Sequence, residues 1–276
     1  MNTDQNMNPN NDWIEPNPFS LDAVISSKAS KMPPQRIIIY GTPGIGKTTF
    51  ASTFEKPILL RLENGASTLD IPTFPNLAAT MQELDDACRA LRNKHEFKTL
   101  IIDSLDWLEP IVWSYVCQNE NKANIEDFGY GKGYIKTDDI WKRLRHKLDY
   151  LCDTMNMNIV VIAHAAIVNY DPPDMESYQR YSLKLHKRAS AIWTEWADML
   201  LFVNHDVRVI KEDSNKKGKA TGLGNRIVFT QERPAYQAKN RWGLPSEIDI
   251  GDDVKWSIFH ETLKNAVDAK LNKENR

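Results

Sequence analysis

The sequence has few cysteines, no long apolar segment and no strong excess of charge of either sign. Its 276 residues include only Cys88, Cys117 and Cys152, which form no C-x-x-C pair. A structural zinc site is therefore not expected. The three cysteines are instead expected to be reduced thiols in a cytoplasmic protein. No apolar run approaches the roughly 20 residues that cross a bilayer, so no membrane partner is expected. The N-terminus lacks the basic and apolar regions of a signal peptide.

The net charge of −2 gives no global sign of nucleic-acid binding, which would have to depend on local basic patches. Composition instead divides the chain into three parts. Residues 1–32 are rich in Asn and Pro and predict a disordered or loosely docked tail. Residues 33–252 form the expected core, and residues 253–276 predict a C-terminal helix and tail.

Short apolar runs alternate with helical stretches throughout the expected core. The predicted strands are 36–40, 57–62, 98–102, 158–163 and 199–204, and the predicted helices are 47–54, 78–93, 105–118, 136–155 and 187–197. This alternation predicts an α/β fold, with a mostly parallel central sheet flanked by helices. The runs 206–211, 225–230 and 235–239 predict an antiparallel extension on the C-terminal side, with a hairpin tip at 212–224.

The strongest motif follows the first predicted strand and opens the first predicted helix. The segment GTPGIGKT matches the Walker A pattern G-x-x-x-x-G-K-[ST] at every fixed position. Its glycines let backbone N–H groups surround a phosphate, and Lys47 is placed to reach the β- and γ-phosphates as a catalytic residue. The residues expected to bind the nucleotide are Gly41, Thr42, Pro43, Gly44, Ile45, Gly46, Lys47, Thr48 and Thr49.

A carboxylate at the end of a neighbouring strand would complete a Mg²⁺ site with the Thr48 hydroxyl. Asp103, at the end of the run LIID, is that residue, although a strand-end Asp can also cap the following helix. The residue after it is Ser104 instead of the Glu of standard AAA+ sites. No guanine-reading N-K-x-D motif is visible, which favours ATP as the nucleotide.

At this point the chain resembles the RecA-like ATPases, whose catalytic glutamate follows the second core strand. The resemblance implies that Glu63, in LRLENG, polarises the attacking water. It also implies that His164, at the end of the strand NIVVIAH, senses the γ-phosphate and transmits its state to the next loop. A solvated loop acid and a surface histidine are the alternatives for these two residues.

The segment AKNRWG resembles the K-x-R element that RecA-like ring helicases insert into the site of the next subunit. The resemblance implies that Lys239 and Arg241 stabilise charge on the γ-phosphate of a neighbour, and hence that the protein self-associates into a ring or filament. Arg226 and Arg233 are weaker candidates for the same role. The alternative is a basic hairpin that pairs only with surface acids.

RecA-like proteins contact single-stranded DNA through loops after the Walker B and sensor strands. The corresponding segments here, 127–136 and 165–190, combine glycine, aromatic and basic residues, a composition suited to stacking bases and neutralising phosphates. The candidate DNA contacts are Phe128, Tyr130, Lys132, Tyr134, Lys136, Arg180, Lys184, Lys187 and Arg188. Ordinary surface loops are the alternative.

The order of these elements over residues 33–250 resembles phage-type nucleotide-binding proteins with a RecA-like core, some of which are single-strand annealing or recombination ATPases. That resemblance implies a Mg²⁺-dependent ATPase that acts on single-stranded DNA in the bacterial cytoplasm, alongside other phage replication or recombination proteins. One alternative is a ring motor or helicase loader in phage replication. Another is a nucleotide-gated assembly module that does not bind DNA.

Overall fold

A computed structural model describes residues 32–65, 69–206, 208–210, 219–221, 224–251 and 253–274. The tail expected over 1–32 and the hairpin tip expected at 212–224 lie largely outside these residues. The helices are α1 (Lys47–Ser52), α2 (Met81–Ala90), α3 (Leu105–Asn119), α4 (Lys132–Asp153), α5 (Lys187–Trp196), α6 (Ser257–Glu274) and a 3₁₀ turn at Ile125–Phe128. The strands are β1 (Arg36–Gly41), β2 (Pro57–Arg61), β3 (Thr99–Asp103), β4 (Asn158–Tyr170), β5 (Tyr178–Leu183), β6 (Met199–His205), β7 (Arg208–Ile210), β8 (Lys219–Thr221), β9 (Arg226–Phe229) and β10 (Glu247–Gly251).

The central sheet has the strand order β10-β9-β6-β1-β4-β3-β2, with β5 paired to β4 outside this path. Strand β1 lies between β4 and β6 and runs parallel to both. Strands β2, β3 and β4 are also parallel, whereas β9 and β10 are antiparallel additions beside β6. The prediction of a mostly parallel α/β sheet with an antiparallel extension is therefore confirmed.

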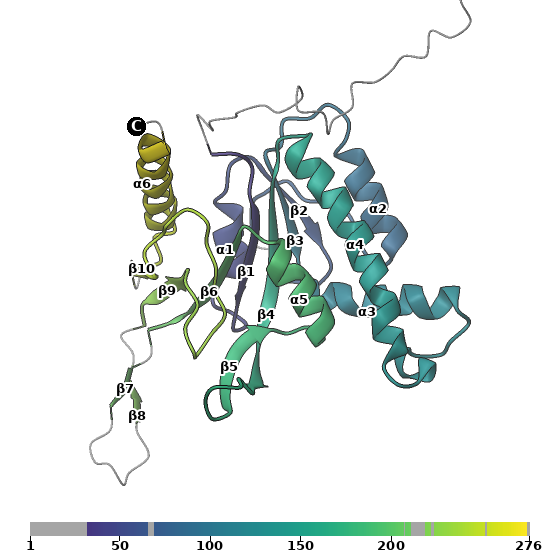
Figure 1. Cartoon of the computed structure of the whole chain (residues 1–276). Helices are drawn as coiled ribbons and strands as arrows, with labels where there is room; N and C mark the ends of the chain where they lie inside the picture. The colour runs from purple at the N-terminus through teal and green to yellow at the C-terminus, as the bar shows by residue number, and fades with distance from the viewer. Residues whose placement is uncertain are drawn as a thin grey trace, which may run out of the picture.

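Alternating residues of β1 face the two halves of the hydrophobic core, as the period of a strand requires. Ile38 and Tyr40 pack with the helices α2, α3, α4 and α5, and Ile37 and Ile39 pack with α1 and α6. Figure 1 shows these two layers of helices on opposite faces of the sheet. Because both faces are covered, the parallel strands consist almost entirely of apolar residues.

The structure differs from the sequence-based prediction in two connections. Strand β4 continues to Tyr170 and pairs with β5 as an antiparallel hairpin, where a long basic loop was expected. This hairpin projects beyond the sheet at the carboxyl end of β4 (Figure 1). Residues 235–239 form isolated bridges through Tyr236 and Lys239 instead of a strand, and the antiparallel edge is completed by β10.

Two expectations about the chain as a whole can be compared with the described residues. Cys88, Cys117 and Cys152 are buried and form no disulfide, as reduced thiols should. No helix in the described part of the chain is long and apolar enough to cross a membrane.

Glu109 is a buried carboxyl group at the contact between α3 and the start of α5. It is 7% exposed, and both of its oxygens accept from the backbone N–H of His186, at 2.9 and 3.1 Å. Burial raises the pKa of Glu109 to about 7; the hydrogen bond from His186 opposes this rise and the charge of Asp106 adds to it. The folded protein therefore holds a proton that the unfolded chain releases at lower pH.

We predict that Glu109 lowers the free energy of unfolding as the pH rises from 4.5 to about 7. Between the ordinary pKa of 4.5 and the folded value of about 7, the folded state binds more protons, so the free energy of unfolding falls with increasing pH. Glu109→Gln should remove this fall and raise the melting temperature above that of the wild type at pH 8, by a few degrees. Thermal unfolding from pH 5 to pH 8 measures the effect. Glu96→Gln, at an exposed position, should follow the wild type, and parallel curves for Glu109→Gln and wild type would contradict the prediction.

Candidate nucleotide site

The phosphate loop leaves the sheet at the carboxyl end of β1 and enters α1 at Lys47. A Cβ atom on Gly41 would lie 2.2 Å from the carbonyl oxygen of Val203, so only glycine allows β1 to lie this close to β6. Gly46 has a φ of 96°, a left-handed conformation that glycine adopts without strain. The strand–loop–helix context that the Walker A motif requires is therefore present.

A cavity of about 320 Å³ opens over this loop. Its walls combine residues of the loop and α1 with polar side chains from three other strands, at the carboxyl edge of the parallel sheet. The lining residues are Gly44, Gly46, Lys47, Thr48, Thr49, Glu63, Gly65, Leu69, Asp103 and His164. The structure thus brings Glu63, Asp103 and His164 to the phosphate loop. Strands β2 and β3 end at this edge of the sheet, and β4 extends beyond it from His164, which is level with Gly41.

Lys47 is a nearly buried cation that has no carboxylate partner among the described residues. Its Nζ donates to the carbonyl oxygens of Gly41, at 3.2 Å, and Thr42, at 3.0 Å. Burial lowers its pKa, and the negative charges of Asp103, Asp106 and Glu63 oppose that effect. A buried ammonium group held only by carbonyl oxygens is suited to receive an anion, and a phosphate supplies one.

Thr48 and Asp103 form the pair expected to hold Mg²⁺. The Thr48 hydroxyl donates to Oδ2 of Asp103 at 2.7 Å, and Asp103 is 6% exposed. Burial raises the pKa of Asp103 to about 6, against the hydrogen bond from Thr48. No cluster of three or more His, Cys, Asp or Glu residues in the described ranges could enclose a metal. One hydroxyl and one carboxylate fit Mg²⁺, which takes its remaining ligands from water and phosphate.

Glu63 is held at the cavity by the residue that follows Asp103. The Ser104 hydroxyl donates to Oε1 of Glu63 at 3.0 Å, and Ser104 is completely buried. The backbone N–H of Leu62 also donates to the carbonyl oxygen of Asp103, at 2.7 Å, which ties the Glu63 segment to β3. Although Ser104 occupies the place of the usual AAA+ glutamate, it therefore orients a carboxylate that comes from the neighbouring strand.

Asp106, which the sequence did not single out, fixes His164. Its Oδ2 lies 2.8 Å from Nδ1 of His164, and its Oδ1 accepts from the backbone N–H of His164 at 3.0 Å. Burial acts to raise the pKa of Asp106, but the hydrogen bonds from His164 outweigh burial, and the pKa of Asp106 is lowered. The available signal was a second acid three residues after Asp103, on the first turn of the predicted helix.

Comparison with known proteins agrees with this geometry. A model of the AAA domain family matches residues 33–242, about three quarters of the chain. The chain belongs to the AAA domain family. This membership confirms the predicted P-loop ATPase core, with the serine at position 104 as a departure from the standard site.

Two individual proteins are similar to this AAA domain protein. The SPbeta prophage-derived uncharacterized protein YorG of Bacillus subtilis (strain 168) is 25% identical over 138 residues. The match covers 47% of this chain and 41% of YorG, so it spans less than half of that relative. The crystal structure of the RadB recombinase aligns with a TM-score of 0.44 and 12% identity, over 81% of this chain and 90% of that chain.

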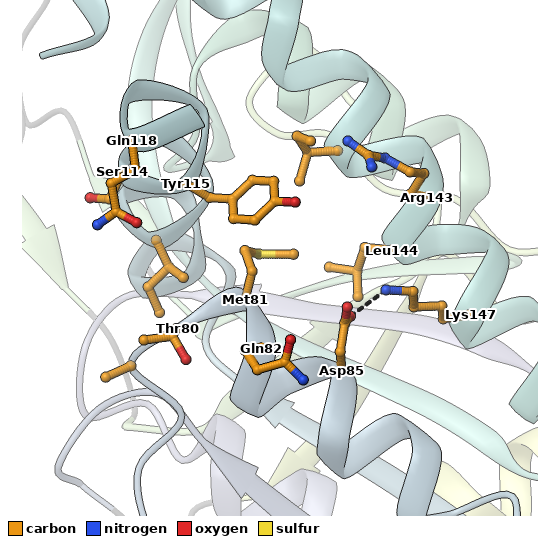
Figure 2. A pocket seen from close by; sticks show the side chains of 13 residues that line it. Thr80, Met81, Gln82, Asp85, Ser114, Tyr115, Gln118, Arg143, Leu144 and Lys147 are labelled. Atoms are coloured by element: carbon orange, nitrogen blue, oxygen red, sulfur yellow. Dashed lines mark hydrogen bonds and ion pairs between the residues drawn. The ribbon is translucent and has the colours of Figure 1, made fainter. Parts of the chain in front are cut away.

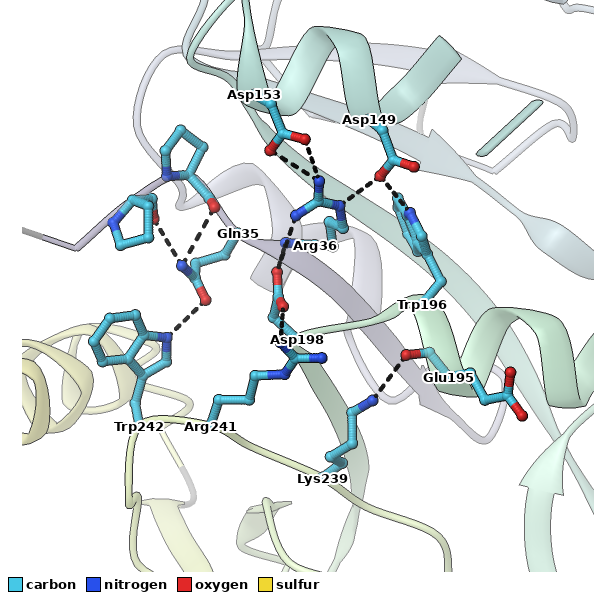
Figure 3. A network of polar contacts seen from close by, with 12 residues as sticks. Gln35, Arg36, Asp149, Asp153, Glu195, Trp196, Asp198, Lys239, Arg241 and Trp242 are labelled. Atoms are coloured by element: carbon cyan, nitrogen blue, oxygen red, sulfur yellow. Dashed lines mark hydrogen bonds and ion pairs between the residues drawn. The ribbon is translucent and has the colours of Figure 1, made fainter. Parts of the chain in front are cut away.

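Lys239 and Arg241 lie at the opposite edge of the sheet from Lys47. Lys239 bridges Leu200 near the start of β6, and its Nζ donates to the carbonyl oxygens of Thr194 and Glu195 at 2.9 and 3.2 Å. Arg241 is 61% exposed and lies 3.4 Å from Asp198. Figure 3 shows Arg241 directed at Asp198, which Arg36 also approaches together with Asp149 and Asp153. Lys239 is directed separately at Glu195. Neither residue can reach the phosphate loop of its own chain.

The first segment expected to contact DNA is more ordered than a mobile loop. Phe128 ends the 3₁₀ turn, and Lys132, Tyr134 and Lys136 belong to the first turns of α4. Tyr134 stacks on His186 with a ring-centroid distance of 4.0 Å, and Lys136 pairs with Glu120 at 2.7 Å. A Cβ on Gly133 would lie 2.3 Å from the carbonyl oxygen of Ile125, so this glycine serves close packing. Tyr130 is the fully exposed member of the set.

The second segment divides into paired and unpaired basic residues. Arg180, in β5, pairs with Glu232 at 2.9 Å and lies over the ring of Tyr170, and Arg188, in α5, pairs with Asp138 at 2.5 Å. Lys184 and Lys187 are exposed and form no ion pair with the described residues. They flank the junction between the hairpin and α5.

A larger cavity, of about 400 Å³, lies apart from the phosphate loop between α2, α3 and α4. Figure 2 shows Tyr115 and Met81 directed into it and Lys147 turned toward Asp85, with which it forms an ion pair. No residue of the Walker A loop lines this cavity. The site chemistry therefore belongs to the smaller cavity, where the polar strand ends converge.

We predict that Lys47→Ala weakens nucleotide binding at least about 10-fold, because it removes a charge-assisted contact to phosphate. Isothermal titration with ATP and Mg²⁺ measures the affinity, and Lys142→Ala, on the exposed face of α4, serves as the matched control. Wild-type affinity in Lys47→Ala would contradict the assignment of the cavity.

Proposed function

We propose that this protein is a Mg²⁺-dependent ATPase that acts on single-stranded DNA in recombination, annealing or replication. The observation that supports it is the convergence of Lys47, the Thr48–Asp103 pair and Glu63 on one cavity, at the base of the β4–β5 hairpin. The prophage origin of YorG supports a phage context, with other phage replication or recombination proteins as partners in a bacterial cytoplasm.

The proposal assigns a role to each of the four polar residues that converge on the cavity and to Ser104. Lys47 exchanges its two loop carbonyls for phosphate oxygens, and Thr48 and Asp103 hold Mg²⁺, which neutralises phosphate charge when bound. Glu63 orients the attacking water, and Ser104 keeps its carboxylate in place as a positioning residue.

The same site is connected to the hairpin through His164. The backbone carbonyl of His164 accepts from the N–H of Lys184 at 2.9 Å, so both ends of the β4–β5 hairpin meet at this residue. Asp106 holds the His164 ring and backbone on the other side. A movement of His164 in response to the γ-phosphate therefore displaces the base of the hairpin, and with it Lys184 and Lys187.

We predict that single-stranded DNA binds at this junction and stimulates ATP hydrolysis. The double variant Lys184→Ala/Lys187→Ala should bind a fluorescent oligonucleotide more weakly, because two phosphate contacts are lost. The slope of log affinity against log salt should become shallower by about 1.4, since each contact to single strands contributes about 0.7. Fluorescence anisotropy and an ATPase assay with and without DNA measure both effects, with Lys94→Ala/Lys142→Ala, at exposed positions, as the charge-matched control. Equal slopes for the two double variants would place the DNA elsewhere.

The positions of Lys239 and Arg241 support a site shared between subunits. They lie at the amino edge of the parallel strands, whereas the nucleotide cavity lies at the carboxyl edge. Only a head-to-tail neighbour would bring the two together, and such contacts generate rings or filaments. Arg241 is the exposed member of the pair, and Lys239 would have to leave the carbonyl oxygens at the end of α5.

We predict that Arg241→Ala retains ATP binding and lowers turnover by about 10³-fold, the lower end of the effect of an arginine finger. Mixing it with Glu63→Gln, which should be inactive alone, should restore activity, because some interfaces then combine an intact Glu63 with an intact Arg241. Arg89→Ala, at an exposed site on α2, is the control, and melting temperatures verify that the Asp198 contact is dispensable for folding. Absence of rescue at every mixing ratio would contradict a shared site.

A nucleotide-gated assembly module without DNA binding is the second candidate. Ile167 and Met175, in and at the tip of the β4–β5 hairpin, are 60% and 55% exposed, which suits a protein partner better than a phosphate backbone. In that case ATP turnover would be unaffected by oligonucleotides, and the hairpin would respond to the nucleotide through His164 in the same way.

A further inference from the structure

Arg226 lies beside the phosphate loop of its own chain, on the side away from Glu63 and Asp103. It is the first residue of β9 and pairs with His205 at the carboxyl end of β6. A Cβ atom built on Gly46 would lie 3.7 Å from Nη1 of Arg226 and 3.3 Å from the ring of Trp256. The guanidinium group is therefore next to the loop that receives the phosphates.

Two polar atoms of this neighbourhood are buried and have no hydrogen-bond partner among the described residues. Nε of Arg226 is buried without a hydrogen bond, and no ion pair with the described residues involves its guanidinium group. Nε1 of Trp256, a residue that is 5% exposed, is also buried and unpartnered. Trp256 is fixed by stacking on Phe50, at a ring-centroid distance of 4.5 Å and an angle of 9°. Because the half-buried guanidinium group has no counter-ion among the described residues, an anionic ligand would supply one.

The sheet order defines which end of the nucleotide Arg226 would meet. Asp103, Glu63 and His164 come from β3, β2 and β4, on one side of β1, whereas Arg226 is reached through β6, on the other side. If Mg²⁺ and the γ-phosphate occupy the first side, the α-phosphate and nucleoside extend toward the second.

We propose that Arg226 binds the α-phosphate end of the nucleotide in cis, with Trp256 forming the wall that positions its guanidinium group. This inference depends on the proposed nucleotide binding, and it adds Arg226 to the residues of that site. It replaces the weaker sequence-based expectation that Arg226 acts in the site of a neighbouring subunit.

Binding of ADP and of a non-hydrolysable ATP analogue distinguishes the two ends of the triphosphate. Arg226→Ala should weaken both ligands by the same factor, about 10-fold or more, because both carry the α-phosphate. Arg226→Lys should recover part of the affinity. Arg89→Ala, at an exposed position on α2, is the control and should match the wild type. Isothermal titration measures the affinities without any need for turnover.

A loss confined to the ATP analogue, or no loss with either ligand, would overturn the proposal. If thermal unfolding shows that Arg226→Ala does not fold, the affinities of Arg226→Gln and Arg226→Lys are compared instead. Equal affinities of these two variants would also overturn the proposal. Failure of the wild-type protein to bind either ligand would instead overturn the proposed function. A Lys47→Ala variant that loses binding, beside an Arg226→Ala variant that does not, would remove only the role of Arg226.

Discussion

The contact between Gly41 and the backbone of Val203 determines where the phosphate loop leaves the sheet. With β1 held this close to β6, the chain turns out of the sheet at its carboxyl edge, and Lys47 begins α1 directly above the strand ends. Any side chain at position 41 would force the two strands apart. Glu63, Asp103 and His164 meet the loop because β2, β3 and β4 all reach this same edge of the sheet.

A single short segment, from Asp103 to Glu109, then connects four parts of the molecule. Asp103 accepts from Thr48 of α1, and Ser104 donates to Glu63 after β2. Asp106 holds His164 at the base of the hairpin, and Glu109 accepts from His186 before α5. Because these side chains project from one strand end and the first turns of one helix, a displacement caused by a bound nucleotide would be shared by the Glu63 segment, the hairpin and α5.

The sequence predicted the residues whose position depends on local order along the chain. Lys47, Thr48, Asp103 and His164 each stand at a strand end or helix start that the apolar pattern marks, and the structure places all of them in one cavity. The partners Asp106 and Ser104 depend on which strands are neighbours, and a single sequence does not contain that information.

Two errors of the sequence-based prediction, in the segment 127–136 and in the length of β4, also have physical causes. The segment 127–136 was expected to be a loop, yet Gly133, in the first turn of α4, is needed for close packing against Ile125. The apolar run of β4 ends at Ala163, but Ile167, Val168 and Tyr170 continue the strand, since β-branched and aromatic residues favour extended backbone even where the sheet no longer covers them.

The two arginines proposed to contact the nucleotide lie at opposite edges of the sheet. Arg226 lies at the carboxyl edge, beside its own phosphate loop, and Arg241 lies at the amino edge, beside Asp198. A residue at the first edge is available in an isolated subunit, whereas a residue at the second requires a neighbour. If both act as proposed, affinity is a property of the single chain and turnover is a property of the assembly. Binding would then be independent of protein concentration while the rate per subunit rises with it.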